Sequence, residues 1–228
     1  MSHFENFDGY KFMPVLGFSG SNKSLLMNDL FRSGHQVIDF EKIIGIDGAC
    51  LAPLTRDKHL ESPLDSQVFN LLSSFDKARP IFVEWKSSDV LGYSLPLSFT
   101  SAIRNSLAVV LNESFQNRVN NICTRYSCWA DHLDLVLDKL VNISRKGFLL
   151  PLALHQQLKE CKDVEFFVEI VLRWLDSVYQ NEIDLFRNKL FGKCKIVGGE
   201  VVIIGSLTTP RISLRKEFRM SSATHKHH

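Results

Sequence analysis

The chain has 228 residues, of which 45% are hydrophobic and 23% charged, and its formal net charge is +2. This is an ordinary globular composition, and the length suffices for one α/β domain with a large core and a small helical addition. No apolar run approaches the ~20 residues that a helix needs to span a bilayer, which argues against a membrane protein. The first residues, MSHFENFDGYKF, contain acidic side chains and no apolar run, which argues against a secretory signal.

The five cysteines are scattered along the chain and form no C-x-x-C pair. Such a set is typical of reduced thiols and not of a disulfide framework. We therefore expect a cytoplasmic protein.

The first 112 residues alternate between short apolar runs and segments of helical periodicity. The apolar runs have the length of strands and are 12–17, 36–40, 80–85 and 107–112. The helical segments between them are 23–34, a stretch near 65–76, and 96–105. Because the runs lack polar alternation, this order predicts an α/β fold with a parallel sheet covered on both faces.

From about residue 115 the pattern becomes mainly helical. Helical spacing of apolar and charged residues occupies 116–143, 149–160 and 163–190. The later segment KIVGGEVVII (195–204) predicts either a Gly-Gly hairpin or one late strand. We expect three parts: an α/β core at 1–115, a helical section with the late strand or hairpin at 116–206, packed on the core, and a basic flexible tail at 207–228.

The residues GFSGSNKS at 17–24 resemble a phosphate-binding P-loop, G-x-x-x-x-G-K-[ST], and depart from it only at Asn22. The motif follows the first predicted strand and opens the first predicted helix, which is the context that a P-loop requires. Backbone N–H groups of such a loop converge on phosphate oxygens, assisted by the helix dipole. Lys23 would contact the terminal phosphates, and the hydroxyl of Ser24 would bind Mg²⁺. The candidate ligand-binding residues of the loop are Gly17, Gly20, Ser21, Asn22, Lys23 and Ser24.

Asn22 leaves two interpretations open. Asparagine is among the few non-glycine residues that tolerate a positive φ, at a cost of about 1 kcal/mol. The loop would then keep its backbone while the side chain obstructs a β-phosphate. The loop is therefore either a working phosphate site or the structural relic of one.

Two acidic residues stand at the ends of predicted strands. Glu84 ends the strand PIFVE, where a Walker-B acid reaches Mg²⁺ through water. Asp39, with Glu41 close behind it, ends the second strand. Open α/β sheets bind ligands at this edge, although acids there are also often simply solvated. We expect Lys23 and Glu84 to be the catalytic residues, and Ser24, Asp39 and Glu84 to be the Mg²⁺ ligands.

Several motifs follow one another in an order known from one enzyme family. They are GFSGSNKS (17–24), GHQVIDFE (34–41), SQVFNLL (66–72), PIFVEWKSSDVLGYSLP (80–96) and LAVVLNESFQNRV (107–119). This succession resembles the C-terminal P-loop domain of tRNA 2-selenouridine synthase, which geranylates and selenates wobble 2-thiouridine. The resemblance implies a P-loop NTPase-like fold, a nucleotide or diphosphate ligand, Mg²⁺ and tRNA. It also implies that Arg118 contacts the diphosphate or the tRNA backbone, since guanidinium groups suit phosphate.

Besides Asn22, and Lys86 and Ser88 where the family usually has Glu and Arg, the chain departs from this family in two larger features. The family's basic H-R-G-S loop is replaced by GIDGA (45–49), which keeps only Gly48. The family's rhodanese domain, which carries the catalytic cysteine, has no counterpart before the P-loop. We therefore expect a phosphate and tRNA platform and not the complete synthase, and it stays open whether a separate rhodanese-type protein is its partner.

Other functions remain open. A degenerate P-loop would serve as a binding or regulatory module without catalysis, and a P-loop after the first strand also occurs in small-molecule kinases. The segment 207–228 has five basic residues against one acidic residue, which leaves −2 on the rest of the chain. This tail is compatible with RNA contact, and also with a short solvated end. The aromatic residues Trp129, Trp174, Phe166 and Phe167 lie at helical spacings and predict core packing.

Overall fold

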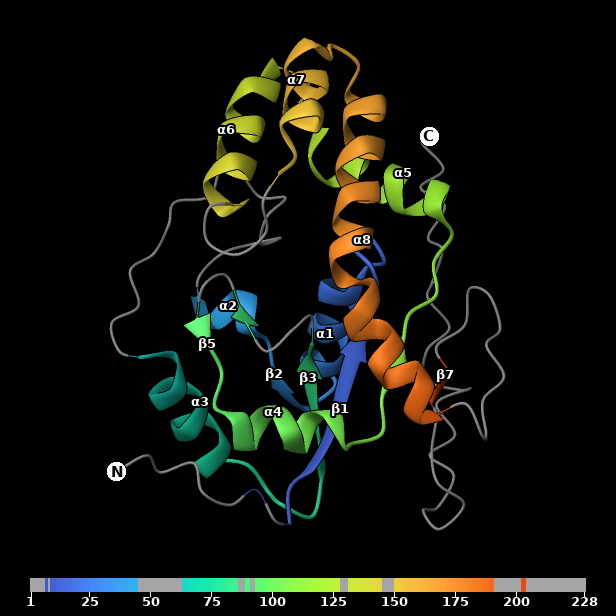
Figure 1. The fold of residues 1–228 in the computed structure, drawn as a ribbon. Helices are drawn as coiled ribbons and strands as arrows, with labels where there is room; N and C mark the ends of the chain where they lie inside the picture. Colours follow the sequence, from blue (N-terminus) through green and yellow to red (C-terminus); the bar gives the residue numbers. More distant parts are fainter. Residues whose placement is uncertain are drawn as a thin grey trace.

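Strands and helices alternate along the first half of the chain, and helices predominate in the second half (Figure 1). The structure is a computed structural model that describes residues 7, 9–44, 63–85, 89–90, 93–127, 131–144, 150–190 and 202–203. The strands are β1 (Lys11–Leu16), β2 (Gln36–Ile38), β3 (Pro80–Glu84), β4 (Asp89–Val90), β5 (Tyr93–Ser94), β6 (Val109–Val110) and β7 (Val202–Ile203). The helices are α1 (Lys23–Arg32), α2 (Phe40–Ile44), α3 (Leu64–Ser73), α4 (Leu97–Arg104), α5 (Phe115–Arg125), α6 (Leu133–Ser144), α7 (Leu152–Glu160) and α8 (Val164–Leu190).

The central sheet has the strand order β2-β3-β1-β6-β7. The first four of these strands run parallel, and β7 pairs antiparallel with β6. Val15 of β1 stands opposite Glu84 on one side and Val109 on the other, so the carboxyl ends of the three strands meet at one edge. The predicted α/β fold with a parallel sheet is confirmed for these four strands. The late strand expected within 195–204 is β7, and the Gly-Gly turn lies outside the described residues.

Both faces of the sheet are covered, which explains why its strands lack polar alternation. Because successive side chains of a strand point to opposite faces, Phe12 and Leu16 of β1 enter one apolar cluster, which includes Phe99 of α4. Met13 and Val15 enter a second cluster on the other face, which includes residues of α1. Covered strands of this kind position the loops at their carboxyl ends rigidly.

The helices of the second half form an apolar cluster of their own, and α8 belongs to two clusters. Phe167, in the first turn of α8, is fully buried among α5, α6 and α7. Phe186, near the other end of α8, is buried in the cluster of the sheet. Figure 1 shows α8 running from the helical group down beside the sheet. In the described part of the chain, no helix is long and apolar enough to cross a membrane.

The predicted aromatic packing is confirmed for two residues. Phe167 and Trp174 are buried, whereas Phe166 is 50% exposed, because neighbouring residues of a helix point to different faces. Trp129 lies outside the described residues.

The observed elements differ from the predicted ones in three places. The helix expected at 116–143 is divided, because Tyr126 leaves helical geometry with φ −118° and ψ 43° before α6 begins. Helix α2 is not among the predicted elements. At its start, the backbone N–H of Lys42 donates to a carboxylate oxygen of Asp39 at 3.1 Å. The pattern also predicts no β4–β5 pair, a short antiparallel ladder after β3.

Candidate phosphate-binding site

The loop between β1 and α1 enters the helix through a left-handed residue. Asn22 has φ 62° and ψ 28°, and it is the only non-glycine residue with a positive φ among those described. Gly20, two residues earlier, also has a positive φ of 83°. Asn22 therefore adopts a positive φ, the conformation that asparagine tolerates better than most non-glycine residues.

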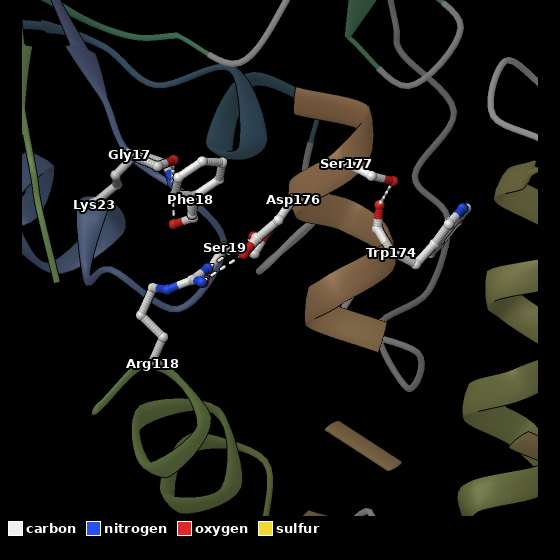
Figure 2. Close-up of polar contacts among 8 residues, drawn as sticks. All are labelled: Gly17, Phe18, Ser19, Lys23, Arg118, Trp174, Asp176 and Ser177. Carbon is white, nitrogen blue, oxygen red and sulfur yellow. Dashed lines mark hydrogen bonds and ion pairs between the residues drawn. The ribbon is translucent and has the colours of Figure 1, made fainter. Parts of the chain in front are cut away.

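Lys23 is buried beneath this loop, with 5% of its surface exposed. Its ammonium donates to the carbonyl oxygen of Gly17 at 2.6 Å and to that of Phe18 at 3.0 Å (Figure 2). The charge is thus held at the carboxyl end of the central strand by the loop itself. An anion that entered the loop would be attracted by this charge.

Helix α5 contacts the next two carbonyl groups of the loop. Arg118 donates to the carbonyl oxygen of Ser19 at 3.1 Å, and the side-chain amide of Asn121 donates to that of Gly20 at 2.9 Å. Gly20 lies directly against α5, since a Cβ atom there would be 2.7 Å from the carbonyl oxygen of Arg118. Glycine is required at this position for two reasons, the positive φ and the lack of space.

Arg118 is also joined to helix α8. It is 4% exposed, and its guanidinium donates to both carboxylate oxygens of Asp176, at 2.8 and 2.5 Å (Figure 2). The guanidinium carbon also lies 5.1 Å from the ring centroid of Phe18 in the loop. The expected contact of Arg118 with phosphate or RNA stays a prediction, and in this structure the side chain connects the loop to α8.

A pocket opens between the loop and α5. Its volume is about 460 Å³, counted with the open space at its mouth. From the loop and the sheet side it is lined by Ser19, Gly20, Asn22, Lys23, Ser24, Glu41 and Glu84. From α5 and the residue after it, it is lined by Asn121, Ile122, Arg125 and Tyr126. The pocket thus has a lysine, two serines and two glutamates on one side, and an arginine with other polar and apolar residues on the other.

The acidic wall differs in one residue from the predicted metal-ligand set. Glu84, at the end of β3, is 3% exposed and lines the pocket together with Ser24, as expected from the sequence. Asp39 is not among the described residues that line it, because its carboxylate caps α2 and lies 3.8 Å from the ammonium of Lys42. Glu41, two residues later, lines the pocket instead and is 6% exposed.

This donor set would suit a metal ion only together with a ligand. Within the described residues, no three His, Cys, Asp or Glu side chains lie close enough to hold a metal by themselves. Mg²⁺ is ordinarily held by one or two carboxylates, with phosphate oxygens and water completing its octahedron. The carboxylates of Glu84 and Glu41 and the hydroxyl of Ser24 fit that arrangement.

A second, smaller pocket lies on the side of the loop that faces α8. Its volume is about 260 Å³, and it is lined by Leu16, Gly17, Ser19, Lys23, Trp85, Tyr179 and Ile183. Lys23 and Ser19 line both pockets, so the loop separates them.

Sequence reasoning missed Asn121 and Asp176. The first had a detectable signal, because Arg118, Asn121 and Arg125 are spaced to lie on one face of a helix. No sequence signal pointed to Asp176, since it is 58 residues from Arg118 along the chain and lies on another helix.

A scan against protein-family models and searches of curated proteins and of solved structures found no match to this chain.

Proposed function

We propose that this protein is a P-loop NTPase-like protein that binds a nucleotide or a diphosphate, together with Mg²⁺, at residues 17–24. The observation that carries the proposal is the position of Lys23. Its buried ammonium lies at the carboxyl end of the central parallel strand, and Lys23 lines a pocket together with two serines and two glutamates. Ligands of open α/β sheets bind at this edge.

Each residue would have a definite role in such a complex. The N–H groups that open α1 would bind phosphate oxygens, because they have no acceptor within the helix and the helix dipole favours an anion there. Lys23 would neutralise the terminal phosphate, and Ser24 with Glu84 and Glu41 would hold Mg²⁺. If a group is transferred, Lys23 would stabilise the charge that develops on the departing phosphate, and Glu84 would position the metal.

The proposal extends to tRNA modification through the resemblance to tRNA 2-selenouridine synthase. In that case the ligand pocket would serve a tRNA-modifying transferase, and a separate rhodanese-type protein would supply the sulfur or selenium chemistry. The rival proposal is a binding module without catalysis. Asn22 favours the rival, because it lines the pocket at the position where the P-loop pattern has a glycine without a side chain.

Calorimetry tests the binding proposal. The protein would be titrated with ATP, GTP, inorganic diphosphate and geranyl diphosphate, each with and without Mg²⁺. We expect at least one to bind, and Lys23→Ala to abolish the heat, because an unpaired phosphate charge would be left in the pocket.

The matched control is Lys11→Ala. Lys11 lies at the opposite end of the same strand, where its ammonium donates to the carbonyl oxygen of Ala78 at 3.0 Å on the surface. This variant should bind like the wild type. Equal affinity in wild type and Lys23→Ala would refute phosphate binding through this loop.

The variant Glu84→Gln distinguishes the contribution of Mg²⁺ to binding from that of the phosphate contacts. The variant should keep part of the affinity for diphosphate but lose its dependence on Mg²⁺. Undiminished Mg²⁺ dependence in Glu84→Gln would remove Glu84 from the metal site. Ligand binding without turnover in wild type, with and without tRNA, would favour the module without catalysis.

A further inference from the structure

Asp176 lies outside both pockets and yet is connected to the loop. It belongs to α8, its side chain is 22% exposed, and it is not among the described residues that line either pocket. Its partner Arg118 is 4% exposed and lies on α5. The ion pair therefore joins two helices at the point where α5 meets the loop (Figure 2).

Arg118 contacts the loop in three ways. It donates to the carbonyl oxygen of Ser19, it lies 5.1 Å from the ring centroid of Phe18, and its backbone packs against Gly20. A displacement of the guanidinium would therefore change the surroundings of Phe18 and Ser19, while the backbone of Arg118 stays against Gly20.

The geometry of the guanidinium makes its position depend on Asp176. A guanidinium is a planar fork of five donors, and a carboxylate that accepts two of them fixes the plane. In this orientation, Nη1 reaches both Asp176 and the carbonyl oxygen of Ser19. Without the carboxylate, a buried cation would lose its charged partner and would reorient toward water.

The orientation of the Ser19 carbonyl group determines the direction in which the backbone N–H of Gly20 points, and so whether it could donate to an anion. In a planar trans peptide the C=O of one residue and the N–H of the next point in opposite directions. Holding the Ser19 oxygen toward Arg118 therefore aims the N–H of Gly20 away from Arg118. Gly20 lines the larger pocket, so a flip of this peptide would exchange the positions of an oxygen and an N–H donor beside the pocket.

We propose that Asp176 is a positioning residue that fixes Arg118, and through it the Ser19–Gly20 peptide, in the form that receives phosphate. The affinity of the loop for phosphate thus depends on a residue of α8 that does not touch the ligand. This inference rests on the proposed phosphate binding, and its test includes one measurement that does not need a ligand.

The first measurement is calorimetry with inorganic diphosphate and Mg²⁺ on the full chain. Asp176→Asn should weaken binding by about tenfold or more, the usual effect of removing one charged hydrogen-bond partner. Asp176→Glu keeps the charge and should restore part of the affinity. Glu169→Gln is the control, since Glu169 pairs with Arg173 on the same helix, at 3.7 Å, and should leave the affinity unchanged.

The second measurement is amide hydrogen exchange without ligand. In Asp176→Asn, exchange should increase at residues 17–24 and stay unchanged in β3, because the loop loses its tether while the sheet keeps its core. A merely structural role would increase exchange in β3 and α8 together, and that result would overturn the proposal. Unchanged affinity for diphosphate in Asp176→Asn would overturn it as well.

Arg118→Lys keeps the proposal testable if Asp176→Asn does not fold. Lysine retains a charge beside Asp176 but has no planar fork, so it cannot hold the carboxylate and the Ser19 carbonyl in the same geometry. It should show the same loss of affinity and the same faster exchange at 17–24, and wild-type behaviour would refute the inference. If the wild type binds no diphosphate or nucleotide, the proposed function fails, while the exchange experiment still decides whether α8 holds the loop.

Discussion

Asn22 is the one residue in which 17–24 depart from the P-loop pattern, and its backbone has the positive φ that asparagine accommodates. It starts α1 with φ 62° and ψ 28°, and its side chain makes no capping hydrogen bond. The side chain instead lines the pocket. If phosphate binds in this pocket, it would therefore meet asparagine where the P-loop pattern has glycine.

We expect Asn22→Gly to bind phosphate ligands more tightly than the wild type. Glycine removes a side chain at the pocket wall, and a gain of about 1 kcal/mol in binding would lower the Kd roughly fivefold. Calorimetry with the ligand that binds wild type measures this change. Weaker binding by Asn22→Gly would show that the amide of Asn22 is itself a ligand contact.

Gly20→Ala should destabilise the fold through both conformation and contact. The residue has φ +83°, and the new Cβ would lie 2.7 Å from the carbonyl oxygen of Arg118 and 3.0 Å from its Cβ. Gly34→Ala is the matched control, because Gly34 has φ +78° but no atom within 4 Å of the new Cβ. We expect Gly34→Ala to cost about 1–2 kcal/mol from φ alone.

Gly20→Ala should cost about 1–3 kcal/mol more than the control, which is the usual range for overpacking. Urea denaturation of both variants measures the difference in free energy of unfolding. Equal losses of unfolding free energy in the two variants would mean that the loop can move away from α5 at little cost. The contact between the loop and α5 would then not be rigid.

At the scale of the elements, α8 is the helix that connects the helical group with the sheet. Phe167 near its beginning packs with the other helices, and Phe186 near its end packs with the sheet. Asp176 lies between them, where the helix passes the loop. The position of Asp176 is therefore held from both ends by apolar packing.

Phe167→Ala should lower the free energy of unfolding by about 3–5 kcal/mol, because it removes a fully buried ring and leaves a cavity. Phe166→Ala is the control in the adjacent position, where the ring is 50% exposed, and it should change stability by less than about 0.5 kcal/mol. Thermal or urea unfolding followed by circular dichroism measures both. Similar effects of the two substitutions would contradict the observed orientation of α8.

At the scale of the whole molecule, the distribution of charge along the chain determines which part would attract RNA. The segment 207–228 carries a net +4 and the rest of the chain −2, so the basic tail is the main attraction for a polyanion. The tail lies outside the described residues, and its part in RNA binding stays a prediction from the sequence.

We expect tRNA binding to weaken with salt and to depend on this tail. Each phosphate contact contributes nearly one unit to the slope of log K against log salt on a duplex, so deletion of residues 207–228 should reduce the slope by at most about five units. Arg118→Ala should weaken binding more than it changes the slope if Arg118 acts within a defined pocket. Filter binding at several salt concentrations, with a tRNA and a single-stranded control, measures these effects.

Unchanged affinity after deletion of the tail would refute its role. No binding of any RNA at low salt would favour the binding module without catalysis over a tRNA-modifying protein.

The sequence alone determined the features that depend on neighbours along the chain. Apolar runs predicted the four parallel strands, and the order of glycine, lysine and serine predicted a loop that opens α1. The positive φ of Asn22 was also predictable, because backbone preferences are a property of the residue itself. The break in the helix after α5 was not predictable, since no glycine or proline lies near Tyr126 to indicate it.

Only the tertiary structure decided which distant groups share the site. Two acids follow β2, and only the start of α2 determines that Asp39 caps the helix while Glu41 lines the pocket. The pairing of Arg118 with Asp176 depends on how α5 and α8 pack, and no local pattern encodes a contact between residues 58 positions apart. Local preferences act within a few residues, whereas such contacts form only when burial of apolar faces brings whole elements together.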